Sequence, residues 1–303
     1  MNNKVSAARL SIFSNSLLIT LKFVVGIFTG SVSIISEAIH STMDLAASVI
    51  AYIAVKLSSQ PPDKGHPYGH EKIENVSGVT EAILILVASF LIIYEAVKKL
   101  IHHEHVTQIG WGILVMGISC AVNIFVSKIL YKVGKKEESV ALEADALHLK
   151  VDVYTSLGVA LGLLLLWVTG LHFLDPLIAI IIALLILKEA YGMLEHAYRP
   201  LVDSKLTDEE IQKIQNIIEQ YNDYFIGLHD LRTRRAGKIK HIDLHLTAPP
   251  YMTIKEYHEV CDLIEKNIDS ALNNTRLLIH IEPCEKQCVS CSIKKRSKYC
   301  KPK

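Results

Sequence analysis

The stretch ALEADALHLKVDVYTSLGVALGLLLLW, residues 141–167, decides the fold. It places His148 and Asp152 four residues apart at the start of a long apolar run, and a second copy of the pattern, His40 and Asp44, lies in SEAIHSTMDLAASVIAY, residues 36–52. Residues four apart share one face of a helix. Two such helices facing each other predict a cage of two imidazoles and two carboxylates, which suits a tetrahedral divalent metal, zinc above all. The alternative is that each pair only forms polar contacts between membrane helices.

The chain divides by composition into a membrane part and a soluble part. Half of its charged residues lie after Pro200, in the last third of the chain. The first 200 residues contain six apolar segments near the ~20 residues that span a bilayer. These segments cover residues 9–29, 33–55, 76–100, 109–131, 146–170 and 175–197. We therefore expect a six-helix transmembrane domain over 1–200, and the first span shows no signal-peptide cleavage site.

The positive charges predict the orientation in the membrane. The first and fifth connections carry no Lys or Arg, whereas the amino terminus and the second and fourth connections do. The basic residues concerned are Lys4, Arg9, Lys56, Lys64, Lys72, Lys132, Lys135 and Lys136. By the positive-inside rule both termini are cytoplasmic. Lys98 and Lys99 count against this orientation, but they are outnumbered.

Residues 201–284 read as a small soluble domain. TDEEIQKIQNIIEQY, 207–221, predicts an amphipathic helix capped by Thr207. GLHDLRTRRAG and KIKHIDLHLTA predict two strands joined near Gly237, followed by a helix over 253–272 and a strand over 276–283. This α-β-β-α-β order is typical of a small two-layer, ferredoxin-like α+β sandwich. A tail rich in Cys and Lys follows over 285–303.

Several motifs in the same order resemble the cation diffusion facilitator family of divalent metal transporters. They are TGSVSIISEAIHSTMDLAAS, DKGHPYGHEKIE, the His148/Asp152 pair, GLHDLRTRRAG and LLIHIEPC. The resemblance implies a homodimer that exports metal from the cytoplasm in exchange for protons. The compact loops and the lack of a long His-rich insertion favour a bacterial inner membrane. It also implies a transport site of His40, Asp44, His148 and Asp152, in which His at the first position goes with zinc; cadmium, cobalt or iron are the other candidates. The two carboxylates would balance the charge of the ion at membrane depth.

The loop after the second span is a second candidate metal site. PPDKGHPYGHEK, 61–72, offers Asp63, His66 and His70, and the resemblance assigns these three to a metal beside the membrane. The alternative is a turn rich in Pro and Gly with solvated histidines. The resemblance also pairs Lys72 with Asp203 as an interlock near the dimer axis. An exposed ion pair contributes only ~0 to 1 kcal/mol, so its expected role is orientation.

The soluble domain carries a third candidate site. His280 and Glu282 are two apart on a strand and so share a face, and the resemblance adds His229, His245 and His258 in a binuclear site between two soluble domains. Taken one by one, these histidines read as ordinary surface residues. The family usually has Asp where this chain has Glu282. His241 shares a strand face with His245. Metal bound there is expected to draw the soluble domains together and regulate the membrane domain.

The cysteines predict a further, softer metal site. Cys284, Cys288, Cys291 and Cys300 form C-x3-C-x2-C-x8-C on the expected reducing side of the membrane. The spacing is not that of a standard zinc ribbon, and the alternative is a basic tail near anionic lipid. Cys120 and Cys261 read as small apolar residues.

Other classes of function fit less well. An intramembrane metalloenzyme is disfavoured because the chain has no His-Glu-x-x-His pair and no evident nucleophile. A channel is disfavoured because a four-ligand cage holds its ion too tightly for fast conduction. A membrane-anchored metal sensor remains the alternative, although it gives the membrane ligands no purpose. No enzymatic activity and no nucleic-acid partner are expected; the partners are metal ions, protons, the lipid bilayer and a second copy of the chain.

Overall fold

The computed structural model describes residues 2–29, 32–102, 110–169, 173–250 and 252–284. Two compact units make up the chain, residues 1–201 and 202–303. Each unit is described by itself below.

Six long helices form the first unit. The bounds are α1 Asn2–Thr29, α2 Val32–Ser58, α3 Lys72–His102, α4 Gly110–Glu137, α5 Val140–Thr169 and α6 Leu174–Tyr198. Pro61 and Pro62 follow α2, and Pro200 follows α6, because proline cannot donate the hydrogen bond that would continue a helix. The six apolar segments of the sequence are thus six helices.

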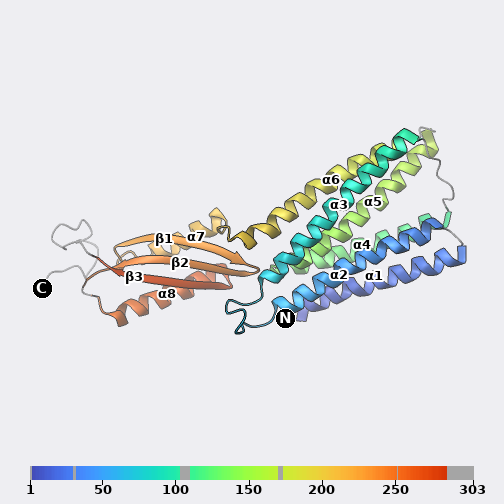
Figure 1. Cartoon of the computed structure of the whole chain (residues 1–303). Coiled ribbons are helices and arrows are strands. Elements are labelled where there is room, and N and C mark those ends of the chain that lie inside the picture. The colour runs from blue at the N-terminus through green and yellow to red at the C-terminus, as the bar shows by residue number, and fades with distance from the viewer. Residues whose placement is uncertain (1, 30–31, 103–109, 170–172, 251, 285–303) are drawn as a thin grey trace. The chain divides into compact units, whose positions relative to one another are not determined.

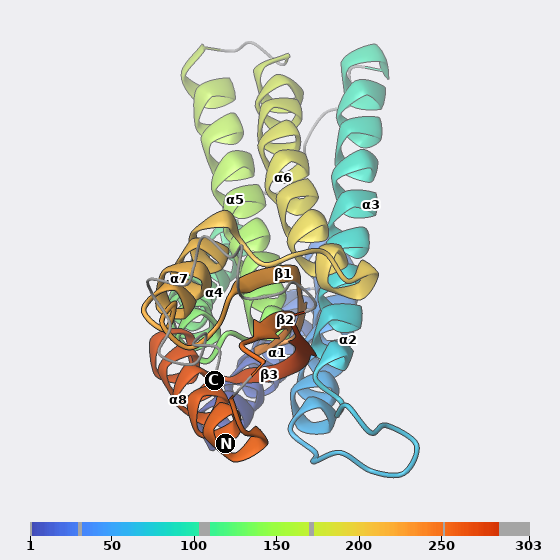
Figure 2. The same ribbon diagram turned by 90° about the vertical axis from the view of Figure 1, so that its left-hand side faces the viewer.

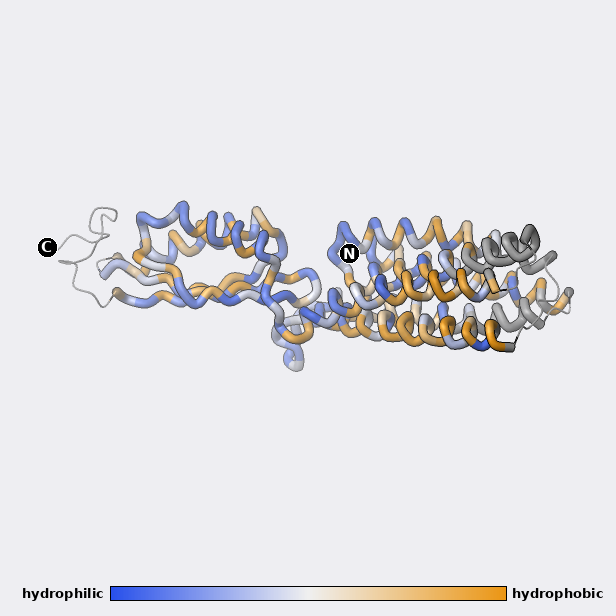
Figure 3. Tube along the Cα trace, turned by 90° about the horizontal axis from the view of Figure 1, so that it is seen from above, coloured by the Kyte–Doolittle hydropathy of each residue, from blue (hydrophilic) through white to orange (hydrophobic). Residues whose placement is uncertain are grey.

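Within the described residues, four of these helices are long and apolar enough to cross a membrane, namely α1, α3, α4 and α6. Side chains at 32–40 and 43 in α2, and at 155, 156 and 158–169 in α5, lie outside the described residues. Figure 3 shows hydrophobic residues along the described parts of the helices. Many large apolar side chains are exposed there, for example Phe13, Phe90 and Leu185. Such a surface suits lipid contact and not water.

The helices fall into two groups in Figures 1 and 2. Helices α1, α2 and α4 form one group, α3 and α6 pack closely together in the other, and α5 contacts both. In both views α3, α5 and α6 diverge from α1 and α2 with distance from the amino-terminal end of α1. Helices α2 and α5, which carry the two His-x-x-x-Asp pairs, meet at the junction of the groups.

A buried polar cluster connects the helices at the end of the bundle that contains the amino terminus. Lys4 Nζ of α1 lies 3.0 Å from Glu74 Oε1 of α3. The Ser58 hydroxyl of α2 donates to the same oxygen at 2.7 Å, and Ser139, between α4 and α5, donates to Glu74 Oε2. A buried carboxylate is stable when its charge and its lone pairs are satisfied. Glu74 therefore ties four segments together at this end.

The second unit has the expected element order. A short 3-10 helix, η1 Arg199–Val202, leads into it. The elements are α7 Asp208–Glu219, β1 Gly227–Ala236, β2 Ile239–Ala248, α8 Ile254–Leu272 and β3 Thr275–Pro283. The sheet order is β1-β2-β3, with β1 and β2 antiparallel and β2 and β3 parallel. Gly237, at the turn between β1 and β2, has φ +54°, a conformation that glycine adopts at no steric cost. The predicted α-β-β-α-β sandwich is confirmed.

One face of the sheet carries the core of this unit. Ile242, Leu244 and Leu246 of β2 are fully buried and cluster with apolar residues of α7 and α8. Both helices lie on the same side of the sheet in Figure 2. Because side chains alternate along a strand, His241 and His245 belong to the opposite face. Among the described residues of this unit, no helix covers that second face.

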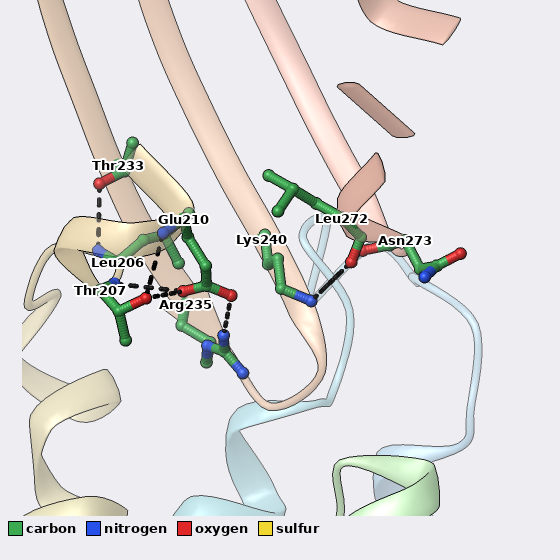
Figure 4. Close-up of polar contacts among 8 residues, drawn as sticks. All are labelled: Leu206, Thr207, Glu210, Thr233, Arg235, Lys240, Leu272 and Asn273. Atoms are coloured by element: carbon green, nitrogen blue, oxygen red, sulfur yellow. Dashed lines mark hydrogen bonds and ion pairs between the residues drawn. The ribbon is translucent and has the colours of Figure 1, made fainter. Parts of the chain in front are cut away.

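Polar contacts hold the helix ends of the second unit (Figure 4). Thr207 and Glu210 form a capping box at the start of α7, and Glu210 Oε1 also accepts from Arg235 of β1 at 2.6 Å. Lys240 is buried on the core face, and its Nζ donates to the carbonyls of Leu272 at 3.1 Å and Asn273 at 3.4 Å. A cation at the last carbonyls of α8 satisfies groups that have no partner within the helix.

Candidate metal centres

The membrane unit brings both His-x-x-x-Asp segments to one place. Asp44 comes from α2, and His148 and Asp152 come from one face of α5. His148 Nε2 lies 3.1 Å from Asp44 Oδ1. One ligand atom from each of the three side chains lies within 4.8 Å of the others. Asp44 is buried and the other two are half-buried. The structure thus brings three of the four residues of the predicted cage together.

His40 is the fourth residue of the predicted cage. It lies on α2 one helical turn before Asp44, but its side chain is outside the described residues. Its part in the cage stays a prediction.

The loop between α2 and α3 gathers the second predicted set. Asp63 Oδ1 lies 3.3 Å from His66 Nδ1, and Asp63 Oδ2 lies 3.4 Å from His70 Nε2. The two imidazole rings are 4.4 Å apart. Asp63 Oδ1 also accepts from the backbone amides of His66 and Gly65, and these bonds, that of His66 above all, lower the pKa of the carboxyl. The loop therefore presents an ionised carboxylate and two imidazoles with ligand atoms within 4.8 Å of one another.

In the second unit, strand register lines up three histidines. His229 of β1 pairs with His245 of β2, which pairs with His280 of β3. Adjacent rings are 5.3 Å and 4.7 Å apart. Glu282, two residues after His280, lies 3.0 Å from His229 Nε2 and 2.9 Å from His245 Nδ1. The longer side chain of Glu282 thus reaches across two strands.

Electrostatics keep this carboxylate ionised. The hydrogen bond from His245 and the nearby charge of His229 lower the pKa of Glu282. One atom each of His229, His245 and Glu282 lies within 4.8 Å of the others, whereas His280 Nε2 is 4.0 Å from Glu282 Oε1. A divalent ion would meet three donors here, with His280 beside them.

His258 lies apart from this row within one chain. It is on α8, in the helix layer, and its Nε2 is 3.8 Å from Asp262 Oδ1. The histidine row lies on the face of the sheet that alternates away from this layer. A shared metal in one subunit therefore does not include His258. His241 is on the same face as His245 but is buried between Arg234 and Arg276 in the strand register.

The remaining predicted residues are only partly covered by the described chain. Lys72 begins α3 in the first unit, and Asp203 lies in the second unit, where its Oδ1 is 3.5 Å from Arg234. Cys284 follows β3, and its amide donates to the Ala248 carbonyl at 3.1 Å. Cys288, Cys291 and Cys300 fall outside the described residues. Burial raises the pKa of Cys261 to about 11, so this thiol stays protonated at neutral pH.

Comparison with known proteins decides the family. The model of the cation efflux transmembrane domain matches residues 8–202, and that of the cation efflux protein cytoplasmic domain matches residues 206–284. The chain belongs to the cation diffusion facilitator family. It is therefore a multi-pass membrane transporter of divalent metal cations and not an enzyme.

Individual members of the family align over most of the chain. The cation-efflux pump FieF of Escherichia coli is 32% identical, over 89% of this chain and 89% of its own. An uncharacterized transporter of Synechocystis sp. is 36% identical, over 85% of this chain and 83% of its own. The metal-bound C-terminal domain of the CzcD transporter from Thermotoga maritima aligns with 26% of this chain and 91% of that domain, at 23% identity and a TM-score of 0.24.

Two buried carboxylates of this family member escaped the sequence analysis. Asp145 precedes His148 by one turn of α5, and Glu81 lies on α3; both are fully buried. Asp145 Oδ1 accepts from Ser48, and Glu81 Oε1 from Ser77, both at 3.0 Å. The second oxygen of each carboxylate has no hydrogen-bond partner in the described structure.

The signal that could have found them is their place in the membrane. Ionisable residues in apolar spans are functional candidates by default. The His-x-x-x-Asp spacing does not reveal them, because neither residue repeats that pattern.

Proposed function

We propose that this transporter exports zinc from the cytoplasm in exchange for protons, by alternating access. The observation that carries the proposal is the approach of Asp44 on α2 to His148 and Asp152 on α5. These ligands lie where two diverging groups of helices meet, so a relative tilt of the groups would open the site toward one side or the other. Such movement of helix bundles around a central site is how many transporters work.

Zinc is proposed because of the ligand chemistry. Imidazole nitrogen with carboxylate oxygen suits zinc, whereas magnesium and calcium prefer shells of oxygen alone. His40 would complete a four-ligand shell in which two carboxylates balance the two charges of the ion. Cadmium, cobalt and iron are the competing substrates.

Proton exchange is proposed because protons and metal compete for the same atoms. Metal binding needs neutral imidazoles and ionised carboxylates. An empty site with two negative charges is costly within a membrane, and proton uptake relieves that cost on the return step. The histidines are the natural carriers, because imidazole ordinarily titrates near ~6.5.

The other metal centres are proposed to regulate transport in a homodimer. The set Asp63, His66 and His70 would bind metal beside the membrane. The row of His229, His245 and His280 with Glu282 lies on a sheet face that no described helix of its own unit covers, so a second copy can approach it. His258 lies on α8, in the helix layer of its own subunit, and would contribute to this site from the partner subunit.

The proposal also covers the orientation in the membrane, the Lys72/Asp203 pair and the cysteines of the tail. The basic residues near the amino terminus and in the second and fourth connections favour an orientation with both termini cytoplasmic. A bacterial inner membrane is proposed because the loops are compact and a long His-rich insertion is lacking. Lys72 and Asp203 would orient the units near the dimer axis, and the four tail cysteines would offer a softer site.

The test is transport by the purified protein in sealed liposomes that contain a zinc dye and a pH dye. We expect the pH inside the liposomes to rise as zinc enters, because protons leave in exchange. Zinc uptake should stop when the pH gradient is reversed. Zinc movement without any movement of protons would contradict exchange and leave facilitated diffusion as the better account. Zinc binding without any flux would favour the alternative, a membrane-anchored metal sensor.

A further inference from the structure

Helices α4, α5 and α6 surround a cavity of about 780 Å³ that the transport function does not use. Its wall carries four lysines: Lys128 and Lys135 from α4, Lys150 from α5 and Lys188 from α6. The wall also contains Glu143, Glu189 and His196, together with apolar side chains such as Ile124 and Leu147. A lysine from each of three neighbouring helices thus faces one space.

The cavity lies on the other side of α5 from the transport site. The α5 residues in its wall include Glu143, Leu147, Lys150 and Tyr154, which repeat at helical spacing along one face. His148 and Asp152 are absent from the wall. A wall of four lysines also repels a divalent cation. This cavity is therefore not the route of the metal.

Two of the four lysines are available for an anion. Lys135 Nζ lies 2.7 Å from Glu143, and Lys150 Nζ lies 3.6 Å from Glu189. Lys128 and Lys188 make no ion pair with any residue that the structure describes. Four ammonium groups against two carboxylates leave the cavity with two positive charges in excess.

The three central lysines occur at one level along the helices. Lys128 lies nine residues before the end of α4, Lys150 ten residues after the start of α5, and Lys188 ten residues before the end of α6. At 1.5 Å per residue this is ~15 Å from the end of α4, the start of α5 and the end of α6. These helices have 28, 30 and 25 residues, so each would extend only ~4–8 Å beyond either side of a centred core of ~30 Å. The lysine backbones therefore lie ~8–11 Å inside the core, nearer its face on the side of the 59–71 loop, and their long side chains can extend toward that face.

Two tyrosines of the cavity wall lie beside its lysines. Lys135 Nζ lies 5.6 Å from the ring centre of Tyr131, and Lys150 Nζ lies 5.4 Å from that of Tyr154. Tyrosine and lysine together are typical of the interface between hydrocarbon and headgroups, where each has one apolar and one polar end.

We propose that this cavity binds an anionic phospholipid of the leaflet on the side of the 59–71 loop. The phosphate contacts Lys128 and Lys188, and the acyl chains follow the apolar wall at Ile124 and Leu147. A second copy of the chain is a poor occupant, because a symmetric contact would bring the excess positive charges together. Basic pockets between membrane helices bind lipid headgroups in this way.

The site has a consequence for transport. One lipid would contact α4, α5 and α6 together, and α6 packs on α3. It would thus link the two groups of helices that must move relative to each other. Anionic lipid is expected to change the rate of metal transport without touching the metal ligands.

The test compares Lys128→Gln/Lys188→Gln with a matched control, Lys132→Gln/Lys136→Gln, which removes two exposed lysines of α4 outside the cavity. Each protein in detergent is titrated with phosphatidylglycerol, and bound lipid is counted by native mass spectrometry. At ~1 kcal/mol for each lysine, the first pair should weaken lipid binding roughly 30-fold. The control and a charge-retaining Lys128→Arg/Lys188→Arg variant should bind as the wild type does.

Two further arms separate lipid from other sources of phosphate and charge. Inorganic phosphate should not displace the lipid, and phosphatidylcholine should not bind with similar affinity. Equal phosphatidylglycerol binding by both glutamine variants, or full displacement by inorganic phosphate, would overturn the proposal. Because binding is measured without zinc, the outcome is independent of zinc transport.

Discussion

Replacing Asp152 by Asn tests the membrane metal centre most directly. Asp152 shares one face of α5 with His148, and both approach Asp44 of α2. Asparagine keeps the size of the side chain and one oxygen but removes the negative charge. The variant therefore separates the charge of the ligand from its shape.

The magnitude follows from the charge of the site. With both aspartates ionised, the two negative charges balance a divalent ion, whichever neutral imidazoles complete the shell. In Asp152→Asn one positive charge is left uncompensated in a buried setting, which typically costs about 3–5 kcal/mol. At about 1.4 kcal/mol for each factor of ten, zinc affinity at this site should fall roughly 100-fold to 4,000-fold.

The assay is zinc uptake into liposomes over a range of zinc concentrations, because the other metal centres would confuse a binding measurement. We expect uptake near the background level at micromolar zinc and a partial return at millimolar zinc. Glu195→Gln is the matched control, since it removes one exposed carboxylate at the end of α6, and it should transport normally. Uptake by Asp152→Asn within threefold of the wild type, in protein that elutes as a folded species, would falsify the assignment.

Three further predictions concern selectivity, pH and stability. His40→Asp should widen transport toward iron, manganese or cadmium, since oxygen replaces nitrogen in the shell; a competition series with an unchanged metal order would contradict this. Residues 202–284 alone should bind zinc and lose it in His245→Ala. Binding should weaken at acid pH, because protons compete with the metal for the same ligand atoms, while the lowered pKa of Glu282 keeps its carboxylate ionised; calorimetry that finds pH-independent binding would count against the site. Lys240→Met should destabilise this domain by ~1–3 kcal/mol, because it leaves the carbonyls of Leu272 and Asn273 without their buried donor. Thermal unfolding should show a Tm lower by at least ~4 °C. An unchanged Tm would mean that water replaces the ammonium group.

The sequence by itself determined the elements and the chemistry of the candidate ligands. Helix and strand periods are local properties, so the six helices, the cap at Thr207 and the turn at Gly237 could be read from neighbouring residues. The spacing of His148 and Asp152 fixed their shared face for the same reason. Charge counts along the connections fixed an expected orientation.

Only the tertiary structure decided which elements meet. The approach of Asp44 to His148 joins residues 104 positions apart, and no local pattern encodes that distance. Strand register aligned His229, His245 and His280, and the layer order placed His258 on the other side of the sheet. The partners of Asp145 and Glu81, and the convergence of Lys128, Lys150 and Lys188 on one cavity, likewise depend on how whole helices pack. Packing is set by the summed contacts of many side chains, so these sites emerge only when the chain is folded.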